Sequence, residues 1–149
     1  FPYTTLFRSH MLHKLGLMGA IRQRALDGAP YMGWSAGSNV ACPSLMTTND
    51  MPIIEPESFK CMNLIPFQIN PHYLDANPEG HGGETREQRI EEFLVVNKEM
   101  TVAGLRESSL FEVDGFELKL KGTKPLRIFR FGREAEEIEQ GADVNFLME

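Results

Sequence analysis

The segment Gly33-Trp34-Ser35-Ala36-Gly37 has the residue types of a nucleophile elbow. In such an elbow a serine lies on a tight turn between a strand and a helix, and its flanking glycines avoid collisions across the turn. The turn exposes the serine hydroxyl and leaves the next amide free to stabilise an oxyanion. The pattern therefore predicts Ser35 as a nucleophile and Ala36 as an oxyanion donor. Because Gly-x-Ser-x-Gly also occurs by chance, the flanking elements must support this interpretation.

The residues around the elbow are typical of the elements that it needs. Pro30-Tyr31-Met32 predicts a short buried strand that enters the turn, and residues 38–41 predict the helix that leaves it. Upstream, residues 9–27 predict one amphipathic helix that Ser9 caps and Gly28 ends. Four apolar residues fall on or near one face of this helix: Leu12, Leu15, Ile21 and Leu26.

A serine nucleophile requires a base within hydrogen-bond reach, and His72 is the candidate base. It follows the strand predicted at residues 66–70. In parallel α/β sheets the ligand crevice lies at the carboxyl ends of the strands, so Ser35 and His72 could both point into it. The alternative is a loop histidine that bonds to a backbone carbonyl.

The acid that would orient His72 has two candidates. Glu107 comes just after a strand predicted at residues 101–105, again at a carboxyl end. Asp50 lies in the loop Thr47-Thr48-Asn49-Asp50, after Ser35 and before His72. Both chain orders are compatible with a triad. Strand geometry favours Glu107, and Asp50 would then be a positioning carboxylate or a loop cap.

Arg86 is the candidate for anion recognition. It begins a helix predicted at residues 86–95, which Thr85 or Glu84 opens after a glycine-rich loop. A guanidinium in this place can form a bidentate pair with a substrate carboxylate. The alternative is an intrahelical salt bridge of Arg86 or Arg89 with nearby glutamates.

Composition argues against several classes of partner. The net charge of -6, from 15 basic and 21 acidic residues, argues against nucleic acid and anionic membranes. Two cysteines, Cys42 and Cys61, make no disulfide framework and suit a reducing compartment. No segment has the length of a membrane span or the pattern of a signal peptide, so we expect a cytoplasmic protein. A metal site from His72, His81 and Glu84 matches no common ligand spacing, and we expect neither metal nor cofactor.

The predicted elements describe an α/β sheet with an antiparallel extension. The strands at residues 66–70 and 101–105 flank the helix at 86–95, and a hairpin around Asp114-Gly115 joins residues 110–113 to 116–120. No strand precedes the first helix. We therefore expect residues 1–9 to be a non-native or disordered leader, and residues 10–149 to be the C-terminal part of a single domain.

Four segments together resemble the peptidase E family of α-aspartyl dipeptidases. They are the elbow with Ser38-Asn39, the loop from Thr47 to Pro52, Gln68-Ile69-Asn70-Pro71-His72, and the stretch from Pro78 to Ile90. The resemblance implies a class I glutamine amidotransferase-like (flavodoxin-like) fold and hydrolysis of Asp-X dipeptides. It implies Ser35 as nucleophile, His72 as base and Arg86 as the group that binds the aspartyl side chain. The family's acid has been placed at the positions of both Asp50 and Glu107, so this choice stays open.

The chain also departs from that family. Members carry an N-terminal half with a Gly-Gly-Gly-Asn turn, whereas the resemblance here starts at His10. That turn would supply the second oxyanion amide beside Ala36, so we expect this chain to be weakly active or unstable. The alternatives are a cyanophycinase-like β-aspartyl peptidase and a non-catalytic ligand-binding domain of the same fold. The oligomeric state is open, with a monomer as the expectation.

Overall fold

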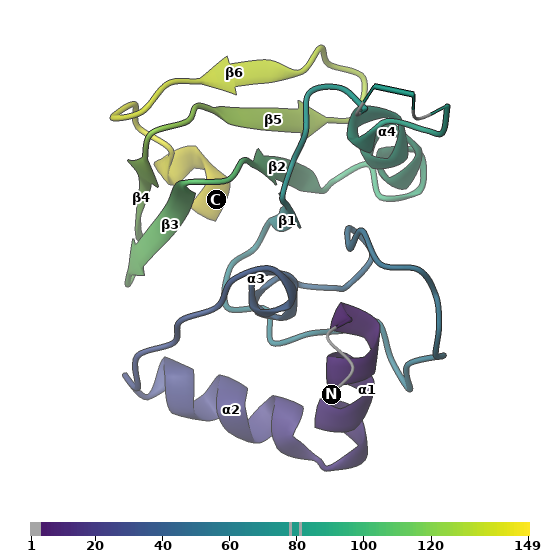
Figure 1. Cartoon of the computed structure of the whole chain (residues 1–149). Coiled ribbons are helices and arrows are strands. Elements are labelled where there is room, and N and C mark those ends of the chain that lie inside the picture. Colours follow the sequence, from purple (N-terminus) through teal and green to yellow (C-terminus); the bar gives the residue numbers. More distant parts are fainter. Residues whose placement is uncertain (1–3, 78, 81) are drawn as a thin grey trace. The chain divides into compact units, whose positions relative to one another are not determined.

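The computed structural model describes residues 4–77, 79–80 and 82–149 of the chain. The chain divides into two compact units, Phe1–Gln68 and Ile69–Glu149, and each is described by itself. The first contains helices and the second is mainly sheet (Figure 1), so the mixed α/β class is confirmed. That residues 10–149 belong to a single domain stays a prediction.

Helices α1 (Thr5–Lys14) and α2 (Leu17–Leu26) replace the single helix predicted over residues 9–27. Gly16 lies between them with φ 66°, a left-handed conformation that interrupts an α-helix. The predicted cap was also wrong, because Thr4 caps α1 and Ser9 is fully buried inside it. Residues 5–9 of the expected leader are therefore helical, and residues 1–3 lie outside the described residues. The foreign origin of the leader stays a prediction.

The core of the first unit joins these helices to α3 (Ala36–Ala41) and the loop after it. Leu6, Met18 and Val40 from the three helices are buried with Leu45 and Met62. Leu12 and Ile21 pack against this cluster, as the predicted apolar face requires. Leu15 and Leu26 are instead 60% and 54% exposed, because the break at Gly16 ends the common face.

The strand predicted at Pro30-Tyr31-Met32 is absent from the structure. These residues have no regular secondary structure, and Met32 is 87% exposed. A strand needs a neighbour to pair its backbone groups. Among the described residues before Gln68, the only strand-like pairing is a bridge between Ser44 and Lys60.

The second unit is built on a four-stranded sheet with the order β1-β2-β5-β6 (Figure 1). Its strands are β1 (Gln68–Pro71), β2 (Thr101–Leu105), β5 (Leu126–Arg130) and β6 (Glu136–Ile138). The amide of Tyr73 donates to the carbonyl of Leu105 at 3.1 Å, so β1 and β2 end at the same edge. Strand β5 is antiparallel to both β2 and β6, as expected of an antiparallel extension.

Helix α4 (Arg86–Val96) packs on this sheet through Ile90 and Leu94. Thr85 caps it and forms a capping box with Gln88, which confirms the predicted start. The hairpin is also confirmed: β3 (Ser109–Asp114) and β4 (Glu117–Gly122) are joined through Gly115, which has φ 59°. The short helix η1 (Asn145–Met148) accepts the amide of Leu118 on β4 through the Asn145 side chain.

Candidate active site

Ser35 has the backbone of a nucleophile elbow. Its φ of 52° and ψ of -114° lie in a region that non-glycine residues rarely occupy, which costs on the order of 1–3 kcal/mol. The residue directly precedes α3, and its side chain makes no cap hydrogen bond to that helix. The hydroxyl is therefore not used for capping, although the local backbone is strained to present it.

The two glycines of the motif have different reasons for lacking a side chain. A Cβ atom at Gly33 would lie 2.7 Å from the carbonyl carbon of Gly37 and 2.8 Å from the hydroxyl of Tyr31. A Cβ atom at Gly37 would lie at an ordinary 3.5 Å from the Tyr31 hydroxyl. Tyr31 closes the turn, because its hydroxyl donates to the Gly37 carbonyl at 2.7 Å. The tight approach therefore makes glycine a strict requirement at position 33.

Ala36 is the first residue of α3 and is buried. The first amides of a helix have no acceptor within the helix. The amide of Ala36 is thus available as a donor beside Ser35, while that of Gly37 bonds the Trp34 carbonyl at 2.9 Å. Its role as an oxyanion donor stays a prediction.

His72 and Glu107 form a hydrogen-bonded pair in the second unit. His72 follows β1, Glu107 lies two residues after β2, and Nδ1 of His72 bonds Oε1 of Glu107. Their side chains are 48% and 73% exposed, and an exposed ion pair contributes only about 0–1 kcal/mol. The pair therefore needs support from its surroundings. His72 itself has φ 55°, a conformation that the fold must hold in place.

Asp50 has a different partner, in the first unit. Its Oδ2 accepts a hydrogen bond from the amide of Leu6 at 3.1 Å, in the first turn of α1. A carboxylate at a helix N-terminus satisfies a free amide and interacts favourably with the helix dipole. Asp50 thus acts here as a cap, which is the alternative that the sequence left open for it. Which acid serves in catalysis stays a prediction.

Arg86 is the first residue of α4, and among the described residues its guanidinium has no recorded ion-pair partner. Arg89 instead forms the salt bridge with Glu84, at 3.4 Å. Partial burial, and then the charge of Arg89, lower the pKa of Arg86. A cation at a helix N-terminus is disfavoured by the helix dipole, so Arg86 does not serve to stabilise the helix. Its role in binding an anion stays a prediction.

Arg106 organises an ionic network that the sequence analysis missed. Its guanidinium binds Asp75 through Nε at 3.1 Å and through Nη2, and it binds Glu137 at 2.7 and 2.9 Å. Hydrogen bonds with Glu137 and Asp75 raise the pKa of Arg106, and the bond from Arg106 lowers the pKa of both carboxyls. The one available signal was an arginine directly before the candidate Glu107 at a strand end.

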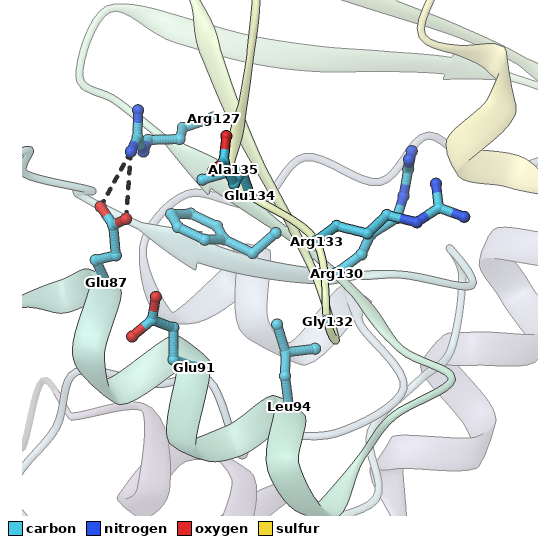
Figure 2. A pocket seen from close by; sticks show the side chains of 10 residues that line it. Glu87, Glu91, Leu94, Arg127, Arg130, Gly132, Arg133, Glu134 and Ala135 are labelled. Carbon is cyan, nitrogen blue, oxygen red and sulfur yellow. Dashed lines mark hydrogen bonds and ion pairs between the residues drawn. The ribbon is translucent and has the colours of Figure 1, made fainter.

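A separate hollow of about 540 Å³ lies beside α4 in the same unit. Figure 2 shows Glu87, Glu91 and Leu94 of α4 on one side, with Arg127 paired to Glu87. Arg130, Gly132 and Arg133 line another part. The hollow contains none of the predicted catalytic residues, so we do not place the active site there.

The expectations about a metal site and a membrane span can be compared with the described residues alone. His81 lies outside them. Among the described residues, no group of three His, Cys, Asp or Glu side chains is placed to hold a metal ion. No helix in that part of the chain is long and apolar enough to cross a membrane.

The sequence matches the model of peptidase family S51 over residues 5–121. The chain belongs to peptidase family S51. Peptidase E of Nostoc sp. is 50% identical over 140 residues, which cover 94% of this chain and 58% of that protein. Peptidase E of Salmonella arizonae is 51% identical and that of Salmonella typhimurium 50%, each over 126 residues, or 85% of this chain and 55% of theirs. The chain thus spans about half the length of the curated relatives it matches.

Proposed function

We propose that the whole protein is a serine dipeptidase that hydrolyses Asp-X dipeptides. The strained backbone at Ser35 carries this proposal. The tight turn at Gly33 holds this conformation, and no structural role in the turn explains it. Membership of family S51 and the relatives named peptidase E support it. The finer fold assignment, a class I glutamine amidotransferase-like sheet, belongs to the same proposal, as does a cytoplasmic location.

The mechanism assigns one role to each residue. Ser35 Oγ attacks the peptide carbonyl while Nε2 of His72 accepts the hydroxyl proton. Glu107 binds Nδ1 of His72, which fixes the tautomer that leaves Nε2 free as the acceptor. The amide of Ala36 stabilises the oxyanion. His72 then protonates the leaving amine, and water hydrolyses the acyl-enzyme.

Arg86 would bind the side-chain carboxylate of the N-terminal aspartate. Its guanidinium is uncommitted among the described residues, and a bidentate pair with a carboxylate suits its planar fork. This contact would select aspartate at the first position of the dipeptide. A cyanophycinase-like enzyme would instead cleave a β-aspartyl bond, and a non-catalytic domain would cleave none.

The test is release of leucine from Asp-Leu, Leu-Leu and β-Asp-Leu, with the longer Nostoc peptidase E as the positive control. We expect this chain to cleave Asp-Leu alone. Ser35→Ala should abolish cleavage. Ser38→Ala is the matched control, because its hydroxyl only contacts the Gly33 carbonyl at 3.4 Å. Cleavage that survives Ser35→Ala would refute the serine mechanism, and cleavage of β-Asp-Leu would favour the cyanophycinase-like alternative.

A further inference from the structure

Arg106 is the most heavily bonded side chain near the His72–Glu107 pair. It lies directly after β2, is only 12% exposed, and binds Asp75 and Glu137 as described above. It also donates to the carbonyl of Pro125 at 2.8 Å. Its guanidinium lies 5.4 Å from the centre of the Tyr73 ring. One side chain therefore joins the loop after β1, the end of β2, the start of β5 and strand β6.

The network continues around Tyr73. Glu137 also binds Arg127 at 3.1 Å, Arg127 binds both carboxylate oxygens of Glu87 at 3.2 Å, and Glu87 accepts the Tyr73 hydroxyl at 3.3 Å. The Tyr73 ring rests on Gly104 so closely that a Cβ there would lie 2.8 Å from it. Tyr73 is thus fixed by contacts on several sides.

The fixed residues are the sequence neighbours of the exposed pair. His72 precedes Tyr73, and Glu107 follows Arg106. These neighbours are held by the bond from the Tyr73 amide to Leu105 and by the bidentate bond from Arg106, which is 12% exposed, to Asp75, which is 62% exposed. The exposed side chains of His72 and Glu107 are joined by the single hydrogen bond between them. A bidentate, charge-assisted fork from a largely buried arginine is stronger and more directional than a single bond between two exposed groups.

We propose that Arg106 is a positioning residue that keeps Glu107 against His72 by clamping the loop after β1 to the end of β2. Its effect on turnover rests on the proposed function, whereas its effect on the pair does not. The alternative is that Arg106 only stabilises the sheet. The two differ in whether loss of Arg106 changes the His72–Glu107 bond in a chain that remains folded.

The first test records the imidazole Nδ1–H signal of His72 by NMR, assigned by its loss in Glu107→Ala. Arg106→Gln should remove or broaden this signal, and Arg106→Lys should restore it only in part because lysine lacks the fork. Arg130→Gln is the matched control: Arg130 also pairs β5 with β6, through Glu136 at 3.4 Å, and should leave the signal unchanged. A signal that persists in folded Arg106→Gln would overturn the proposal.

If Arg106→Gln does not fold, Asp75→Asn replaces it, since Arg106 then keeps Glu137. The signal should weaken in this variant too, and an unchanged signal would count against the clamp.

Kinetics give the second test. Arg106→Lys should lower kcat by up to about 100-fold with KM unchanged, and should add nothing in a Glu107→Ala background. An effect that is additive with Glu107→Ala would assign Arg106 a separate role. Failure of the proposed function is detected separately, because Asp-Leu cleavage would then be unchanged in Ser35→Ala.

Discussion

At the residue scale, the two candidate acids have different partners. Glu107 binds the imidazole of His72, whereas Asp50 binds the amide of Leu6 at the start of α1. An acid that orients a catalytic histidine acts on turnover, whereas a helix cap acts on stability. The two carboxylates can therefore be separated by measuring both quantities on each variant.

We predict that Glu107→Gln lowers kcat for Asp-Leu by up to about 10⁴-fold, because an amide cannot select the same imidazole tautomer. Asp50→Ala should instead lower the free energy of unfolding by about 0.5–2 kcal/mol, the usual cost of a lost cap, with kcat kept. Steady-state kinetics and urea unfolding of both variants check this. A large loss of kcat in Asp50→Ala, with Glu107→Gln active, would reverse the assignment.

Arg86 and Arg89 give a second comparison at this scale. Arg86→Gln should lower kcat/KM for Asp-Leu by roughly 10- to 100-fold, since a hydrogen bond to a charged group contributes about 1.5–3 kcal/mol. Arg89→Gln is the control, because its guanidinium already pairs with Glu84. Equal losses in both variants would indicate a general charge effect instead of a specific contact.

At the element scale, the conformation of the elbow depends on Gly33. We predict that Gly33→Ala lowers the free energy of unfolding by about 1–3 kcal/mol, because the new methyl group would overlap the backbone of Gly37. Gly19→Ala is the matched control: Gly19 lies inside α2 with nothing within 4 Å, so alanine should stabilise by up to about 1 kcal/mol. Urea unfolding measures both. A neutral Gly33→Ala would mean that the turn relaxes without strain.

Local sequence signals predicted several elements well. Strand β2 has its predicted bounds, α4 begins at its predicted cap, and the hairpin turns at Gly115. In each case the information is contained in a short segment: a capping box, an apolar run, or a glycine with positive φ. The strand-end positions of His72 and Glu107 followed from the same local signals and the rule that ligands bind at carboxyl ends.

The failures have a common physical cause, which is dependence on distant residues. Residues 30–32 have the composition of a strand, but a strand forms only beside a partner. The break at Gly16 was hidden because a lone glycine inside a helical pattern is often tolerated. The ion pairs of Arg106 join residues 31 positions apart in both directions, so no local pattern indicates them.

At the scale of the whole molecule, acidic residues outnumber basic ones by 21 to 15. The second unit nevertheless holds two partly buried arginines among carboxylates, with Arg106 between Asp75 and Glu137 and Arg127 between Glu137 and Glu87. These bonds are charge-assisted only while the carboxyls are ionised. The fold of this unit should therefore depend on pH at the acid end.

The direction of this pH dependence follows from the pKa shifts of two carboxyls. The hydrogen bond from Arg106 lowers the pKa of both Asp75 and Glu137 below their ordinary values of 3.8 and 4.5. A group with a lowered folded-state pKa contributes stability that is complete above its unfolded pKa and is lost as the pH falls through its folded pKa. We therefore predict that the contribution of these two carboxyls to the free energy of unfolding is constant near pH 7 and declines below about pH 4.5.

Urea unfolding between pH 7 and pH 3 measures this decline. Arg106→Gln should make it shallower, because Asp75 then loses the arginine that binds it and Glu137 keeps only Arg127. Lys121→Gln is the control on the exposed hairpin. Lys121 also lowers the pKa of a carboxyl, that of Glu112, but the pair is open to solvent and screened by salt. In about 0.5 M salt the Debye length is well below 10 Å, so exposed charges are strongly screened. The difference in acid stability between wild type and Arg106→Gln should therefore persist in this salt, whereas the difference between wild type and Lys121→Gln should disappear. Equal slopes for wild type and Arg106→Gln would show that the network does not govern acid stability.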